Sequence, residues 1–468
     1  MQGQSAAICT RRGAYGGQPG GAITLSRWKS TEGECANLGP VEPVPGPWPN
    51  DPQPDRAALQ QFLLYLGSGL TVAGEAVNEI QDHLEAVAAA YGAPEARFAV
   101  LPTFLVVALD PSEPATLEPT YQLRGGLRLD QTAALYRLLK QARRGEVDPA
   151  EGTLAVVEAM RMPPRFGPAL TILGHALMAT GICLVLQPTP GDVALATAFG
   201  ALVGVLRRLG DGRPRVQMIM PVAAAFVVAS ITFTLARHGW GDADLRAMIA
   251  PLVTFLPGAA LTMGVVELSA AQIVTGSTRL VAGALQLVLL AFGLVAAAQA
   301  FGLPSTSSLV DASHNLLGWW AAPLGVLVFG LGVWIHGSAP RGSAPGLFLV
   351  LLVAFGGQAV GNALLGGYLG GFIGAFVMTP TARMVERTPT GPPALVTFLP
   401  AFWLLVPGAL GLIGVTDYIN NNDAMVGVQE LVSTVGSMVA IALGVLCAYP
   451  LVDSAERVAR RVRTPGSP

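Results

Sequence analysis

Charged side chains are scarce in this 468-residue sequence. They make up 12% of the residues, about half of the fraction that is usual in a soluble protein. The scarcity is uneven, because residues 56–165 carry ordinary charge whereas long windows after Phe166 carry none. We therefore expect two parts with different solvents, water and lipid. The net charge of −2, with no cluster of basic and aromatic residues, argues against nucleic acid as a partner.

Cysteines and catalytic motifs are also few. The four cysteines lie far apart and form neither a CxxC pair nor a Cys/His metal spacing. This pattern argues against a disulfide framework and a zinc site. The sequence has no GxSxG elbow and no HExxH motif, which are the signatures expected of a serine hydrolase or a zinc protease. We therefore expect no enzymatic activity, no metal and no cofactor.

The first part of the chain combines a tail with a small domain. Residues 1–55 are rich in Gly, Pro and Ser and lack the apolar region of a signal peptide, so we expect a disordered tail. Residues 56–165 should form a cytoplasmic α+β domain of a common size. A helical pattern covers 57–91, and Asp130 and Asp148 resemble N-caps of two further helices. Short apolar runs predict strands at 98–101, 104–109 and 121–124.

Beyond Phe166 the sequence has the composition of membrane-spanning helices. A span needs about 20 mostly apolar residues, and the seventh and eighth candidates share one uncharged run that we divide at Gly361 and Asn362. The expected fold is an all-α membrane protein of about ten transmembrane helices behind the small cytoplasmic α+β domain. The windows lie near 168–187, 190–209, 216–236, 247–267, 279–301, 316–335, 345–360, 361–379, 394–415 and 427–449.

Arginines in short loops indicate the orientation, because cytoplasmic loops hold the excess of positive charge. With the front domain inside the cell, the arginines near 207–215, 341 and 383–387 also lie inside, whereas the outer loops are poorer in arginine, with Arg237 and Arg246 as exceptions. We expect a multi-pass protein of the plasma (inner) membrane with both termini cytoplasmic and a cytoplasmic tail at 453–468.

One hexapeptide occurs twice in the membrane part. Leu-Val-Thr-Phe-Leu-Pro spans 252–257 and 395–400, and Pro-Gly-Ala follows at 257–259 and at 407–409. The copies fall in the fourth and ninth windows, which divides the membrane part into two five-helix halves, 166–309 and 310–452. Because five is odd, the second half must enter the membrane from the opposite side, as in the inverted repeats of transporters.

The first copy belongs to a longer stretch that resembles a known family. Residues 251–293, PLVTFLPGAALTMGVVELSAAQIVTGSTRLVAGALQLVLLAFG, are similar to the threonine/serine exporter signature FLPG, LT, EL, SG and RL, with Thr275 in place of the serine of SG. The TFLP and LVPG elements of the second half and the region 125–164 are also similar, so the resemblance covers about 57–452. It implies ten spanning helices, export of L-threonine and L-serine, and drive by the proton gradient. Ala401 follows Pro400 where the first copy has a glycine, so the two half-sites cannot be equivalent.

The candidate substrate-binding residues surround the two motifs. Threonine hydroxyls could meet the hydroxyl and ammonium groups of a hydroxylated amino acid, and helix termini beside proline and glycine could meet its carboxylate. The alternative is that the threonines bond to their own backbone and the prolines only kink packed helices. The set comprises Thr254, Pro257, Gly258, Thr262, Thr397, Pro400, Pro407, Gly408 and Asn362.

Glu267 and Arg279 are the candidates for proton coupling. An ionisable side chain in a spanning segment is costly and is therefore a functional candidate, and a cation across a short loop can adjust the proton affinity of a carboxylate. The alternative is an interfacial salt bridge. His175 and Asn362 fit packing or interhelical hydrogen bonds better than substrate binding.

The sequence therefore favours a secondary active exporter of small hydroxylated amino acids. Its partners would be the amino-acid substrate, protons and the lipid bilayer, and a homo-oligomer stays open. Two alternatives remain: a channel for small polar solutes, and a membrane scaffold with a regulatory cytoplasmic domain. Flux in proteoliposomes separates the three, because a carrier saturates and responds to a pH gradient, a channel gives linear flux, and a scaffold gives none.

Overall fold

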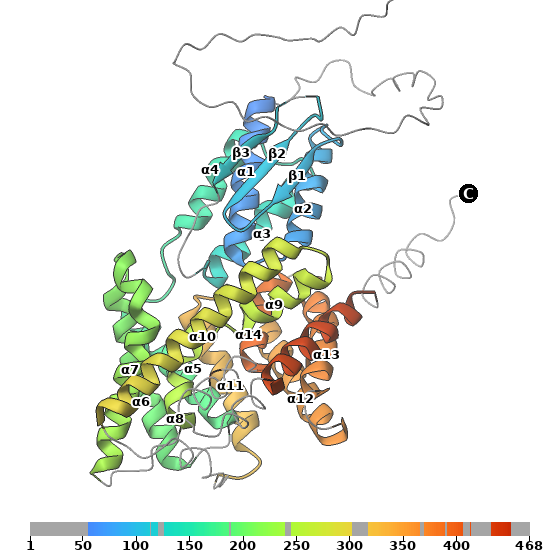
Figure 1. Cartoon of the computed structure of the whole chain (residues 1–468). Helices are drawn as coiled ribbons and strands as arrows, with labels where there is room; N and C mark the ends of the chain where they lie inside the picture. The colour runs from blue at the N-terminus through green and yellow to red at the C-terminus, as the bar shows by residue number, and fades with distance from the viewer. Residues whose placement is uncertain are drawn as a thin grey trace, which may run out of the picture. The chain divides into compact units, whose positions relative to one another are not determined.

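The computed structural model of the chain describes most of the residues after the first 54 (Figure 1). The predicted tails at 1–55 and 453–468 lie outside the described residues, except for Asp55. The described ranges are 55–112, 114–119, 126–186, 189–238, 245–301, 317–365, 369–388, 391–405, 412 and 432–450.

The front domain begins with two helices where the sequence predicts one. Helix α1 (Arg56–Ala73) ends at Gly74, and α2 (Val77–Ala90) begins three residues later. Gly74 has φ 89°, and its amide caps the last turn of α1. Glycine adopts this left-handed conformation without the steric cost of a Cβ atom. The prediction of one helix over 57–91 is wrong, because the apolar period continues across a turn that periodicity alone does not reveal.

Three antiparallel strands form a small sheet in the order β1 (Arg97–Val100), β2 (Phe104–Ala108), β3 (Thr116–Pro119). Val100 pairs with Leu105, and Val107 pairs with Thr116. Leu105 and Val107 are fully buried in the apolar cluster that α1 and α2 share, as expected for alternate residues of a half-buried strand. The first two strands confirm the prediction. The third is β3 rather than 121–124, which lies outside the described residues.

Helices α3 (Leu129–Ala142) and α4 (Pro149–Arg161) complete the front domain. The Asp148 carboxylate accepts hydrogen bonds from the amides of Ala150 and Glu151, so its prediction as an N-cap is confirmed. Asp130 is not the cap of α3, because the helix begins one residue before it, and its carboxylate instead accepts the amide of Gln131.

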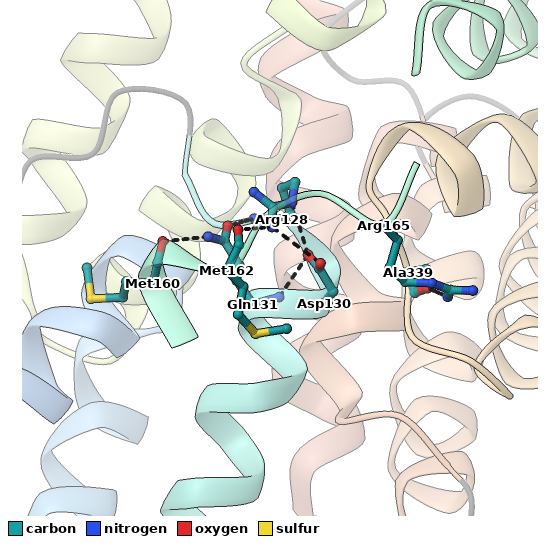
Figure 2. Close-up of polar contacts among 7 residues, drawn as sticks. All are labelled: Arg128, Asp130, Gln131, Met160, Met162, Arg165 and Ala339. Carbon is teal, nitrogen blue, oxygen red and sulfur yellow. Dashed lines mark hydrogen bonds and ion pairs between the residues drawn. The ribbon is translucent and has the colours of Figure 1, made fainter. Parts of the chain in front are cut away.

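The start of α3 is tied to the chain that enters the membrane part (Figure 2). The Arg128 guanidinium lies 3.1 Å from the Asp130 carboxylate and donates to the carbonyl of Met162 at 2.6 Å. Arg165 donates to the carbonyl of Ala339, and the Leu129 amide donates to Gly337. The segment 337–339 therefore lies against the front domain.

The membrane part is helical, as predicted. Six helices in the described ranges are long and apolar enough to cross a membrane, or seven if a bent pair counts as one span. Pro168, Pro190 and Pro214 each stand at the start of a helix, where a missing N–H costs nothing. The six are α5 (Pro168–Val185), α6 (Pro190–Gly210), α7 (Pro214–Arg237), α10 (Ile273–Phe301), α12 (Ala344–Leu365) and the last helix (Val432–Pro450).

The bent pair joins α8 (Leu245–Ile249) and the 3₁₀ helix η1 (Ala250–Phe255) to α9 (Gly258–Ser269), with an angle of 55° at the break. Two shorter apolar helices are α11 (Ala321–His336) and α14 (Ala394–Leu405). Helix α13 (Leu369–Glu386) has a polar end that holds Arg383. Each of the ten predicted windows contains one of these helical segments. Six or seven of the segments meet the length and composition of a span, and the total of ten spans stays a prediction.

Helices α5 and α11 cross at glycines. A Cβ atom on Gly174 of α5 would lie 2.7 Å from the amide nitrogen of His336, and one on Gly325 of α11 would lie 2.7 Å from the carbonyl oxygen of Gly181. Small residues of this kind let two membrane helices approach until their backbones touch. Because Gly174 meets the end of α11 and Gly181 meets an earlier turn, the two helices run antiparallel.

The boundary between the seventh and eighth windows differs from the prediction. Helix α12 continues to Leu365 and α13 begins at Leu369, so Gly361 and Asn362 lie inside a helix rather than between two. A Cβ atom on Gly361 would lie 2.8 Å from the Cα of Gly370. The glycine serves close packing of α12 on α13 and does not break the helix.

Candidate substrate site at a broken membrane span

The first copy of the repeated hexapeptide breaks its helix. Residues 252–255 end the 3₁₀ helix, Leu256 is extended, and α9 starts at Gly258 after Pro257. Proline has no N–H and forces the residue before it out of helical geometry. The break that the sequence predicts at Pro257 and Gly258 is present, as a bend of 55°.

Side chains from neighbouring helices bond to the polar groups that the break exposes. Gln286 of α10 donates to the carbonyl of Phe255 at 3.3 Å. Thr254, one residue earlier, lies 3.0 Å from His175 Nε2. Gln286 is not among the residues that the sequence patterns predict for the site. An uncharged polar residue inside an apolar window is the signal that could have found it, because such residues form hydrogen bonds between membrane helices.

His175 connects three elements. Its ring, on α5, is fully buried, and Nδ1 lies 2.8 Å from the carbonyl of Gly200 on α6 while Nε2 faces Thr254. The His336 ring of α11 lies edge-on to it with centroids 5.3 Å apart, and the Arg207 guanidinium lies 5.3 Å over the Phe255 ring. Interhelical hydrogen bonding, expected for His175, is confirmed, and one of its partners is a candidate substrate residue.

Thr262 and Thr397, both fully buried, differ in their hydrogen bonding. The hydroxyl of Thr262, on α9, has no hydrogen-bond partner among the described residues. The hydroxyl of Thr397, on α14, donates to the carbonyl of Ala394 at 3.0 Å, which is the backbone bond that the sequence analysis gave as its alternative. A buried hydroxyl without a partner is costly, so Thr262 is the stronger candidate.

The two copies of the hexapeptide adopt different structures. The second copy is part of α14, which continues through Pro400 to Leu405, whereas the first stops at Pro257. Val253 of the first copy and Val396 of the second nevertheless belong to one buried apolar cluster. The copies therefore share an apolar cluster but are not equivalent, as the alanine after Pro400 predicts.

The other candidates lie elsewhere. Asn362, near the end of α12, is exposed, and its amide group occupies the space beside Gly370 of α13, which indicates a packing role. Pro407 and Gly408 lie outside the described residues.

Glu267 and Arg279 form an ion pair, with Arg279 Nε 3.1 Å from Glu267 Oε2. Glu267 is fully buried at the end of α9. Its other oxygen accepts the amide of Val77 at 3.3 Å, and Arg279 donates to the carbonyl of Glu75 at 2.9 Å. The pair thus holds the first turn of α2, where a carboxylate also suits the helix dipole. Val77 and Glu75 lie about two hundred residues away in sequence, so sequence reasoning did not link them to the pair.

A second polar contact joins the same part of the front domain to α13. Arg383 lies 3.6 Å from Glu79 and 3.5 Å from Glu386, and its guanidinium lies 6.0 Å over the ring of Tyr449 on the last helix. Burial, and then the nearby Glu79 carboxylate, raises the pKa of Glu75 to about 7. Residues 75–79 therefore contact α9, α10 and α13.

Among the described residues, no group of three or more His, Cys, Asp or Glu side chains could hold a metal ion. The arrangement offers hydroxyl groups, a broken backbone and paired charges, which are suited to binding a polar solute within a membrane.

Comparisons with known proteins find one family and one curated relative. The chain is 21% identical over 255 residues to pheromone-regulated membrane protein 10 of Debaryomyces hansenii, an alignment that covers 53% of this chain and 25% of that protein. The chain thus matches only about a quarter of the length of that curated relative. No solved structure matches the chain significantly. The family described as "Putative threonine/serine exporter" matches residues 61–301, just over half of the chain and including the broken span. The chain is a multi-pass membrane protein that belongs to the threonine/serine exporter family, a family of transporters rather than of enzymes.

Proposed function

We propose that the protein is a secondary active exporter of small hydroxylated amino acids, L-threonine and L-serine, driven by protons across the plasma membrane. The observation that carries the proposal is the break at Pro257 and Gly258 inside the region that matches the exporter family. Transporters hold polar substrates at broken helices near the bilayer midplane, where backbone groups lack partners within the helix.

Each part of the substrate has a candidate partner near the break. The first amides of α9, at Gly258 and the following residues, suit a carboxylate. Thr262 offers a buried hydroxyl without a partner among the described residues. Thr254, at the other side of the break, offers a hydroxyl that is hydrogen-bonded to His175. Thr397 of the second copy would approach from α14. Its neighbour Val396 lies in the same apolar cluster as Val253, the neighbour of Thr254.

We propose two inverted halves and ten spans, and several contacts support the inversion. Glu267, after the first copy, contacts α2 of the front domain, whereas Leu395, at the start of the second copy, packs in the front domain's apolar cluster. The first copy therefore runs toward the front domain and the second runs away from it. In the proposed arrangement α5 and α11 are the first helices of the two halves, and their antiparallel crossing at glycines is the relationship expected about an axis in the membrane plane.

Glu267 and Arg279 are proposed as the proton-coupling pair. A proton on Glu267 would remove the charge that holds Arg279 and weaken its contact with the Val77 amide. Because these contacts join α9 and α10 to the front domain, protonation would loosen the cytoplasmic end of the broken span. The front domain would then act as a gating module on the cytoplasmic side.

The test is transport by the purified full chain in proteoliposomes. Labelled L-threonine should accumulate with saturable kinetics when a pH gradient is imposed, unlabelled L-serine should compete, and a protonophore should abolish the accumulation. Protein-free liposomes are the control. Linear flux that does not respond to the pH gradient would indicate a channel for polar solutes rather than a carrier. The absence of flux would favour a membrane scaffold with a regulatory domain.

A further inference from the structure

The hydrogen bonds of His175 fix the direction in which Thr254 can bond. Nδ1 of the ring lies 2.8 Å from the carbonyl oxygen of Gly200. A carbonyl oxygen only accepts, so Nδ1 must carry a hydrogen. Nε2 lies 3.0 Å from the Thr254 hydroxyl. In the neutral ring Nε2 has a lone pair and no hydrogen, so the hydroxyl of Thr254 must donate to it.

Adding a proton to the ring reverses the second bond. Both ring nitrogens of a charged histidine are donors, so Nε2 would donate to Thr254 while Nδ1 keeps its bond to Gly200. The hydroxyl hydrogen of Thr254 must then turn away from the ring. When the ring is neutral, the Thr254 oxygen can only accept a hydrogen bond from a third group. When the ring is charged, the Thr254 hydroxyl can donate a hydrogen bond to a third group.

The difference matters for an amino acid at the break. An ammonium group only donates and a carboxylate only accepts, so the state of the ring decides which end of the substrate Thr254 can hold. We propose that His175 is a positioning residue that sets the donor or acceptor state of Thr254 and thereby links a proton to substrate binding at the broken span. This inference rests on the proposed transport function and adds a second protonatable group to the pair at the cytoplasmic end.

The groups around His175 make substrate and proton interdependent. The His336 ring of α11 lies against it, with Nδ1 3.2 Å from the Thr171 carbonyl, and Arg207 of α6 lies over Phe255 next to Thr254. Residues 250–255 of η1 contain no ionisable side chain. A positive ring would therefore stand near basic groups, and a substrate carboxylate would offset that charge. Binding of the substrate should favour the proton, and by linkage the proton should favour the substrate.

The experiment compares the pH dependence of the KM for L-threonine in proteoliposomes between about pH 4.5 and 8, a range that reaches below the one in which an exposed histidine changes charge, because the His175 ring is buried beside basic groups. In the wild type the KM should change with pH by about fivefold or more. His175→Gln can still form hydrogen bonds but does not titrate, so its KM should not change with pH. Thr254→Val should raise the KM by about tenfold, which corresponds to one hydrogen bond, and should also remove the pH dependence.

Two variants separate the role in positioning from a structural role. Thr254→Ser keeps the hydroxyl and should restore the wild-type profile. Thr180→Val is the matched control, because it removes a 2.7 Å hydrogen bond between α5 and α6 whose two partners both lie outside the broken span, and its pH profile should match the wild type. If His175→Gln does not insert, Thr254→Val still tests the switch, since it keeps the bond between His175 and Gly200.

A wild-type pH profile in His175→Gln, or an unchanged KM in Thr254→Val, would overturn the inference while leaving the transport function standing. Failure of the proposed function would be recognised differently, by the absence of saturable threonine flux in the wild type at every pH.

Discussion

Glu267 on α9 lies 3.1 Å from Arg279 on α10, and the pair is joined to the front domain through the amide of Val77 and the carbonyl of Glu75. Four groups from three separated segments thus form one largely buried polar contact. The contact lies between the broken span and the front domain, the only part of the described chain that contains β-strands. The protonation state of Glu267 should therefore influence both the broken span and the front domain.

Glu267→Gln should uncouple transport from the proton gradient. The amide cannot ionise, and it leaves the Arg279 charge without its partner, which for a buried pair costs about 3 kcal/mol. We expect threonine flux that saturates but no longer responds to an imposed pH gradient, and a lower melting temperature in detergent. Glu146→Gln is the control, because its pair with Arg144 is exposed and should change stability by less than about 0.5 kcal/mol. Gradient-driven export by Glu267→Gln at the wild-type rate would remove Glu267 from the coupling role.

Thr262→Val should separate function from stability. The Thr262 hydroxyl is buried without a partner among the described residues, so a methyl group in its place should leave stability unchanged or raise it by about 1 kcal/mol. If that hydroxyl binds substrate, the same variant should raise the KM for threonine by about tenfold. Thr397→Val is the matched variant, since its hydroxyl bonds to its own backbone and its loss should cost stability. Melting temperature and KM are measured together, and an unchanged KM in Thr262→Val would show that this hydroxyl does not contact substrate.

Gly174→Ala should disrupt the crossing of α5 and α11. The added Cβ would lie 2.7 Å from the backbone nitrogen of His336, and backbone cannot move aside as a side chain can. We expect a loss of about 1–3 kcal/mol, measured as a lower melting temperature in detergent. Gly356→Ala on α12 is the control, because a Cβ atom added there would meet no neighbouring group within 4 Å. Equal melting temperatures for the two variants would contradict the glycine crossing.

The front domain should lose stability as the pH rises through neutrality. Burial raises the pKa of Glu75 from 4.5 to about 7, so the folded state binds the proton more tightly than the unfolded state. The contribution is fully present below pH 4.5 and is lost as the pH rises through 7, with a total on the order of 3 kcal/mol. Glu75→Gln cannot titrate and should flatten this dependence. Thermal unfolding from about pH 5 to 8 measures it, and parallel curves for the two proteins would refute the assignment.

The sequence predicts the division between lipid and water and the position of the broken span, because composition and a proline-glycine pair are local signals. It does not predict the turn at Gly74, since the apolar period of α1 continues into α2 across a left-handed residue. The sequence does pair Glu267 with Arg279 across a short loop, but it does not predict the partners of His175 or the contact of Glu267 with the front domain. Thr254 is 79 residues from His175 and Val77 is 190 residues from Glu267, and no local pattern encodes such contacts.

The central claim is that the two hexapeptide copies enter one site from opposite faces of the membrane. In a variant without native cysteines, single cysteines at Asp244 and Arg387, a few residues before the two copies, can be labelled with an impermeant maleimide in intact cells. The account predicts that the cysteine at 244 reacts from outside and the cysteine at 387 reacts only after the membrane is opened. Equal labelling of both positions from one side would contradict it.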